Sequence, residues 1–121
     1  MTYLLVGIGG AIGAMLRYFV GSLTPTSFPY GTMIINIMGS LAMGLLIGIL
    51  ARTLPPMQAE IRLFVAVGVL GGFTTFSAFS LDAVTLWERG DLTGAGLYVV
   101  ISVAVSIVAL FAGLMLTRIG A

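Results

Sequence analysis

The residues of this chain that could do chemistry are hydroxyls, one amide and aromatic rings. The 121 residues include no histidine and no cysteine, which removes imidazole and thiolate metal sites and the nucleophilic catalysis that depends on them. The net charge is +1 and no basic run occurs, so nucleic acid is not an expected partner. We therefore expect a protein that is not an enzyme.

One amide stands in a polar stripe. Asn36 is the only asparagine, with Thr32 one helical turn before it and Ser40 one turn after it. Its side chain offers two N–H donors and one acceptor, for which hydrocarbon supplies no partner. The polar stripe either links helices through hydrogen bonds or lines an ion pathway. Because it contains three polar residues in a row along one helix face, the pathway is favoured.

A second polar stripe follows near the end of the chain, where Tyr98, Ser102 and Ser106 recur every four residues among apolar neighbours. A serine hydroxyl can bond the carbonyl of its own preceding turn, so a structural role stays open for each serine singly. The alignment of the three favours a shared pathway.

The segment Gly71–Thr75 combines two glycines with two β-branched threonines and is a poor helix former. It predicts a break in mid-span, which frees carbonyls that protein, water or an ion must satisfy. Phe76 and Phe79 share a face just after the break. They either pack in a core or line a path.

Arg17 follows Gly9 and Gly13 at four-residue steps, a spacing of small residues that is typical of close helix packing. The arginine is either an anchor that reaches the membrane surface beside Tyr18 or a source of positive potential for an anion vestibule. Both interpretations stay open.

The elements that position these residues must be transmembrane helices. Hydrophobic residues make up 60% of the chain and charged residues 7%, against roughly 25% charged residues in a soluble domain. A span needs about 20 apolar residues. The sequence predicts a single four-helix domain over 1–121 in the lipid bilayer, without a cleaved signal peptide, and both termini on one side. The expected spans are about 3–23, 30–51, 60–87 and 93–117.

Positive residues are nearly balanced between the two faces. Arg52, Arg62 and Arg118 lie on the side of the termini, and Arg89 and Arg17 lie toward the other side. Because short-loop arginines normally set orientation, this balance leaves two possibilities equally open. Either opposed copies build an antiparallel dimer, or one arginine fixes a single orientation.

Three motifs, in order along the whole chain, resemble the Fluc (CrcB) fluoride channels of bacteria. They are Gly9-Gly10-x-x-Gly13-Ala14-x-x-Arg17-Tyr18, Gly31-Thr32-x-x-x-Asn36-x-x-Gly39, and the run from Gly71 to Ser80. The resemblance implies an all-α, dual-topology antiparallel homodimer in the inner (plasma) membrane. It also implies passive fluoride efflux through two antiparallel pores.

The resemblance also assigns roles to residues. It implies a vestibule position for Arg17 and a structural sodium ion at the dimer centre, held by the backbone carbonyls of Gly71 and Thr74. Two departures from the family are Ala78, where threonine is common, and Asp82, where glutamate is common. The implied fluoride pathway comprises Asn36, Phe76, Phe79, Ser80, Tyr98, Ser102 and Ser106.

The main alternative is a small four-span multidrug or cation exporter. Such exporters typically exchange protons through a membrane-embedded glutamate in their first span. The first span here contains no acidic residue, and Asp82 is the only acid far from a loop. The sequence therefore favours the channel.

Overall fold

The computed structural model describes residues 1–25 and 27–118, Arg118 by its backbone only. It contains four helical spans that are long and apolar enough to cross a membrane. The chain is thus a multi-pass membrane protein, as predicted. The helical spans are α1 (Thr2–Ser22), α2 (Tyr30–Thr53), a third span over Gln58–Glu88, and α6 (Leu92–Arg118). Each lies within two residues of the predicted bounds. α2 ends where Leu54 adopts a left-handed conformation ahead of Pro55 and Pro56.

The third span consists of four pieces. Its bounds are α3 (Gln58–Ile61), the π-helix η1 (Arg62–Leu70), α4 (Gly71–Phe73) and α5 (Phe76–Glu88). The sequence did not predict that η1 is a π-helix, and no side-chain pattern in that segment indicates this conformation. It coincides with the stretch on which the glycines of α1 pack.

The predicted break lies between α4 and α5, where Thr74 and Thr75 are extended. Thr75 is the N-cap of α5, and its hydroxyl accepts a hydrogen bond from the Ala78 backbone N–H at 3.1 Å. A threonine in this position satisfies one of the amide groups that the start of a helix leaves unpaired. The same residues that make a poor helix interior therefore make a good helix start.

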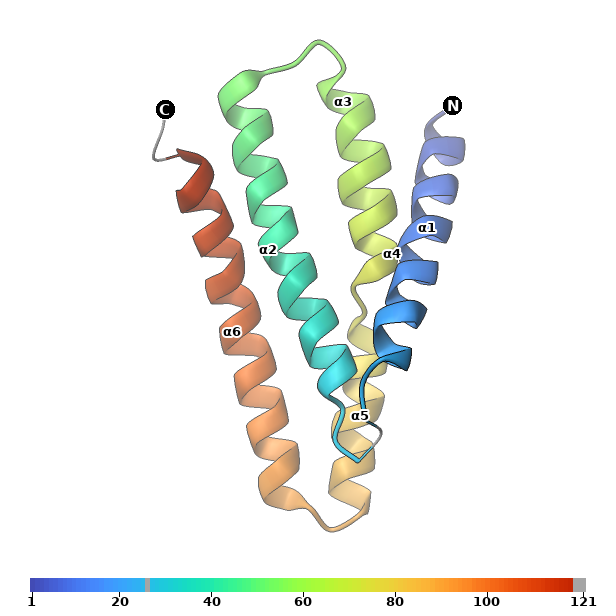
Figure 1. Ribbon diagram of the computed structural model, residues 1–121, viewed down its shortest axis with the longest axis vertical. Helices are drawn as coiled ribbons and strands as arrows, with labels where there is room; N and C mark the ends of the chain where they lie inside the picture. The colour runs from blue at the N-terminus through green and yellow to red at the C-terminus, as the bar shows by residue number, and fades with distance from the viewer. Residues whose placement is uncertain (26, 119–121) are drawn as a thin grey trace.

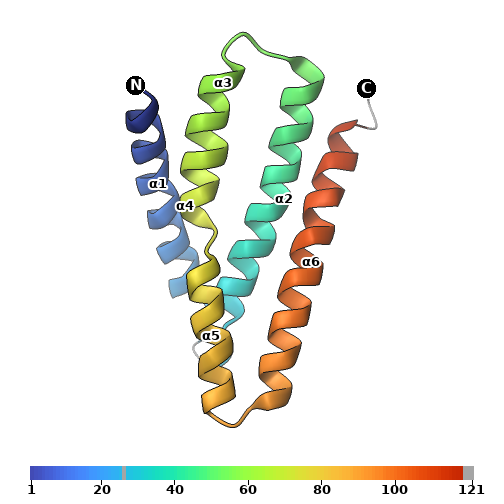
Figure 2. The same ribbon diagram turned by 180° about the vertical axis from the view of Figure 1, so that it is seen from behind.

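The four spans form two packed pairs. α1 lies against η1 and α4, and α2 lies along α6, as Figures 1 and 2 show from opposite sides. The N-terminus, the C-terminal end of α6 and the α2–α3 loop are at one end, which we call the terminal end, and the α5–α6 loop is at the other, the loop end. This arrangement confirms the even number of crossings.

Glycines allow these pairs to approach backbone to backbone. A β-carbon on Gly9 would meet the Phe64 carbonyl, and one on Gly13 would meet the Val69 carbonyl. Gly44 faces the Leu110 carbonyl on α6 in the same way. The close packing predicted from the four-residue spacings is confirmed, and it fixes the rotation of α1 and α2 that carries Arg17 and Asn36 to the break.

Candidate functional site

The helix break is held by a side chain from α2. Asn36 Nδ2 donates to the Thr75 carbonyl at 3.0 Å, and Asn36 Oδ1 accepts from the Thr75 N–H at 2.9 Å. The amide thus replaces the backbone partners that Thr75 loses by being extended. An amide nitrogen carries two N–H groups, so one donor of Asn36 is left after these two bonds.

Arg17 holds the break from the α1 side. Its Nε donates to the Gly72 carbonyl at 3.1 Å, and the side chain is partly buried. The guanidinium is therefore turned toward the broken helix, and the snorkelling interpretation does not describe this contact. Its terminal nitrogens remain for other partners, because the guanidinium carries five N–H donors.

Among the described residues, the carbonyls of Gly71, Phe73 and Thr74 accept no hydrogen bond from a side chain or from a non-helical backbone N–H. The Leu70 carbonyl, by contrast, accepts from both the N–H and the hydroxyl of Thr74, at 3.0 and 2.9 Å. Gly71 is exposed on the surface of the protomer, and a β-carbon there would meet no close neighbour. The sequence resemblance assigned a sodium ion to two of these carbonyls, those of Gly71 and Thr74, and this assignment stays a prediction.

A groove of about 350 Å³, which we call the central groove, runs beside the break. It brings six of the ten predicted site residues together from α2, the third span and α6. Its polar and aromatic lining comprises Asn36, Ser40, Thr74, Thr75, Phe76, Phe79, Ser102 and Ser106. Segments that are far apart in the sequence therefore meet at one site.

Two hydroxyls in the central groove lack a partner. The Oγ atoms of Ser102 and Ser106 are buried and make no hydrogen bond within the described part of the chain, and Ser102 is only 3% exposed. Neither serine bonds back to its preceding turn, which was the structural alternative. Unpaired buried hydroxyls are costly, so the groove offers two unused donors.

The paired phenylalanines have different surroundings. Their ring centroids lie 5.6 Å apart with the planes tilted by 46°. Phe79 is 9% exposed and packs on Tyr98 at 5.3 Å, whereas Phe76 is 77% exposed. Within one protomer, Phe79 is part of the core and Phe76 stands free at the edge of the central groove.

Two predicted pathway residues lie outside the central groove. Ser80 Oγ donates back to the Phe76 carbonyl at 3.0 Å. Tyr98 is fully buried, and its hydroxyl donates to Asp82 Oδ2 at 3.1 Å. In this structure both hydroxyls have protein partners.

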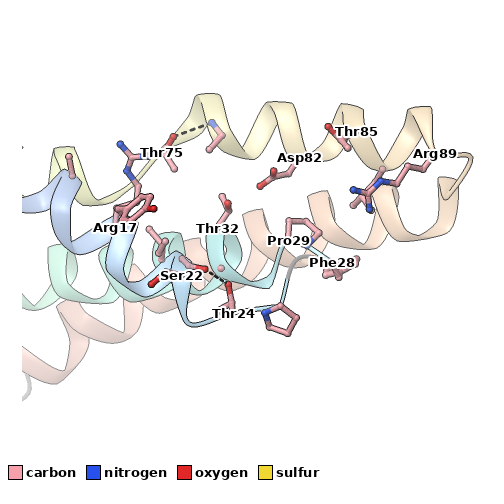
Figure 3. Close-up of a pocket in the computed structure, with 18 residues that line it drawn as sticks. Arg17, Ser22, Thr24, Phe28, Pro29, Thr32, Thr75, Asp82, Thr85 and Arg89 are labelled. Atoms are coloured by element: carbon pink, nitrogen blue, oxygen red, sulfur yellow. Dashed lines mark hydrogen bonds between the residues drawn. The ribbon is translucent and has the colours of Figure 1, made fainter.

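A second cavity of about 640 Å³, the vestibule, opens near the loop end. It lies between α1, α2, α5 and the α1–α2 loop (Figure 3). Arg17, Thr32, Ala78, Asp82 and Arg89 are among the residues that line it. Figure 3 shows Asp82 projecting from α5 toward Thr32 on α2.

Thr75 lines both cavities. The stripe on α2 also passes from one to the other, because Thr32 faces the vestibule while Asn36 and Ser40 face the central groove. Sequence reasoning identified that stripe but did not select Thr32 or Arg89 as site residues. The period of the stripe was the signal for Thr32, whereas nothing in the sequence placed Arg89 over a cavity.

Comparison with known proteins adds two findings. The family described as CrcB-like protein, Camphor Resistance (CrcB), matches residues 4–114. The chain is 54% identical over 122 residues to the fluoride-specific ion channel FluC of Rhodopseudomonas palustris, with 98% of each chain covered. It is 53% identical over 118 residues to the FluC of Agrobacterium fabrum, with 94% of each covered. It is 55% identical over 119 residues to that of a Chelativorans species, with 95% of this chain and 94% of the relative covered.

Proposed function

The chain belongs to the CrcB-like family, and from this premise we propose that it is a fluoride-selective channel through which fluoride passes down its gradient. The relatives that carry the name fluoride-specific ion channel match it over nearly their full length. The central groove supports the same conclusion through its chemistry.

The unpaired hydroxyls of Ser102 and Ser106 carry the proposal. Fluoride is small and strongly hydrated, so a pore must replace its water with hydrogen-bond donors at short range. The two serines and the remaining N–H of Asn36 provide donors in one groove. The exposed ring of Phe76 adds the positive edge of an aromatic quadrupole.

We propose that an antiparallel second copy completes the pathway. The central groove is open on the protomer surface and bordered by the exposed Phe76, yet polar groups at membrane depth need protein or water beside them. The arginines give little orientation bias, with exposed Arg52 and Arg62 toward the terminal end and Arg89 at the loop end. Two opposed copies would form two antiparallel pores in the inner membrane.

We further propose that a sodium ion binds where the two copies meet. The carbonyls of Gly71 and Thr74 accept no hydrogen bond from a side chain or from a non-helical backbone N–H among the described residues, and carbonyl oxygens suit hard cations. When bound, the ion would supply positive charge that compensates the carbonyl dipoles. Arg17 and Asn36 hold the backbone next to these carbonyls, at Gly72 and Thr75.

Fluoride efflux from liposomes tests the function. Purified protein is reconstituted in vesicles loaded with potassium fluoride, valinomycin is added to carry the countercharge, and external fluoride is followed with an electrode. We expect fast fluoride release without any energy source, and much slower release of chloride from matched vesicles. A monodisperse, folded protein that releases no fluoride, or releases both ions equally, would contradict the proposal.

A further inference from the structure

The vestibule contains three ionisable side chains at different depths. Arg17 lies at its inner end beside the break, Asp82 lies on α5, and Arg89 is the C-cap residue that follows α5 near the loop end. Figure 3 shows Arg17 and Arg89 at opposite ends of the cavity with Asp82 between them. Two guanidinium groups and one carboxyl group line the vestibule, so positive groups are in excess there.

Neither guanidinium is neutralised by the carboxylate. Arg17 donates to the Gly72 carbonyl, and Arg89 Nη1 donates to the Ser27 carbonyl at 3.4 Å. Asp82 accepts the hydroxyl of Tyr98 instead. Within residues 1–25 and 27–117, no carboxylate lies at salt-bridge distance from either arginine. Both positive charges are therefore held in place by neutral groups and remain available to an anion.

The two arginines differ in what else they do. Arg17 holds the helix break, so replacing it would disturb the pathway itself. Arg89 is exposed and donates to the Ser27 carbonyl in the α1–α2 loop, which forms one wall of the vestibule. A guanidinium stays ionised at every relevant pH, and clefts with low-dielectric walls focus the field of such charges. Arg89 thus contributes electrostatic attraction without a role in the break.

We propose that Arg89 is a positioning residue for permeation, one that concentrates fluoride in the vestibule and so raises the rate at which the ion reaches the pathway. This inference rests on the proposed function and names a residue that the pathway assignment did not include. Its contact with Ser27 keeps the charge over the cavity mouth.

Three variants test the role of Arg89. Arg89→Gln removes the charge but keeps an amide donor for the Ser27 carbonyl, and Arg89→Lys keeps the charge. Arg52→Gln is the matched control, because Arg52 is exposed near the terminal end and lines neither cavity. Initial fluoride flux is measured at subsaturating fluoride, at ionic strengths of about 0.01 M and about 1 M, where the screening lengths are about 30 Å and 3 Å.

We expect Arg89→Gln to lower flux about two- to five-fold at low ionic strength and hardly at all at high ionic strength. Arg89→Lys and Arg52→Gln should resemble the wild type at both. A loss in Arg89→Gln that is equal at both ionic strengths, or shared by Arg89→Lys, would overturn the inference, as would wild-type flux in Arg89→Gln. A wild type that carries no fluoride would instead overturn the proposed function itself.

Discussion

The side chain of Asn36 pairs with the backbone of Thr75 through two hydrogen bonds, one to its carbonyl and one from its N–H. The amide therefore fixes the geometry of the broken helix as well as facing the central groove. Asn36 is thus placed both to link two helices and to line the central groove.

Replacement of Asn36 by aspartate should abolish flux. The carboxylate keeps the shape and still accepts from the Thr75 N–H, but it cannot donate to the Thr75 carbonyl and it repels an anion. We expect flux per amount of folded protein to fall at least about tenfold, which corresponds to about 1.4 kcal/mol, while size-exclusion chromatography gives the same elution volume as for the wild type. Flux near the wild-type level would mean that the amide is only structural.

The two phenylalanines should respond differently to isoleucine. Phe76 is 77% exposed in the protomer, so Phe76→Ile should leave the folding of the protomer nearly unchanged yet suppress fluoride flux by removing the ring edge. Phe79→Ile also loses the contact with Tyr98 and should lower the free energy of unfolding by about 1 kcal/mol. Flux and thermal unfolding are measured on the same samples. Normal flux in both variants would show that the two rings only pack and do not contact the ion.

Replacing glycine by alanine should distinguish glycines that lie in close helix contacts from glycines that have no close neighbour. A β-carbon on Gly13 would overlap the Val69 carbonyl, so Gly13→Ala should force α1 away from η1 and destabilise the fold by about 1–3 kcal/mol. Gly7→Ala, on the same helix with no close neighbour, is the matched control and should be neutral or slightly stabilising. Equal thermal stability of the two variants would contradict the close contact.

The proposed dual topology should shift to one orientation when positive charges are added to one loop. Pro56→Lys with Met57→Lys adds two positive charges to the exposed α2–α3 loop, which should place that loop in the cytoplasm in nearly every copy. Because the chain has no cysteine, one introduced by Thr53→Cys reports orientation through an impermeant thiol reagent. Without the lysines we expect labelling from both sides of the membrane. Labelling of every copy from one side alone would rule out the antiparallel dimer.

Removal of sodium should loosen the assembly. If the carbonyls of Gly71 and Thr74 hold the ion, exchange into N-methyl-D-glucamine should lower the apparent melting temperature of the dimer, because a ligand that binds the folded state stabilises it by mass action. Titrating sodium back should restore stability in a saturable manner. A melting temperature independent of the cation would show that these carbonyls bind no sodium.

The spans and the break could be predicted because each depends on local sequence. The length of each apolar segment determines whether it can cross the membrane, and the residues of Gly71–Thr75 cannot sustain a regular helix. The partners of Arg17 and Asn36 could not be predicted, since they are 55 and 39 residues distant along the chain. Those contacts depend on how the helices are rotated against one another, which the glycine contacts determine in three dimensions. The position of Arg89 over the vestibule depends on the path of the α1–α2 loop, which no period in the sequence encodes.

Because Thr75 lines both the vestibule and the central groove, the transmembrane voltage should fall unevenly between the two cavities. A water-filled vestibule conducts well and stays close to the potential of the adjoining solution, so the field concentrates in the narrow protein layer between the vestibule and the central groove. A full transmembrane drop of 100 mV is worth about 2.3 kcal/mol for one elementary charge. An anion resting in the vestibule should feel little of it, and an anion crossing beside Thr75 should feel a large share over a short distance. Block from the vestibule should accordingly depend weakly on voltage, whereas movement past the break should depend on it steeply.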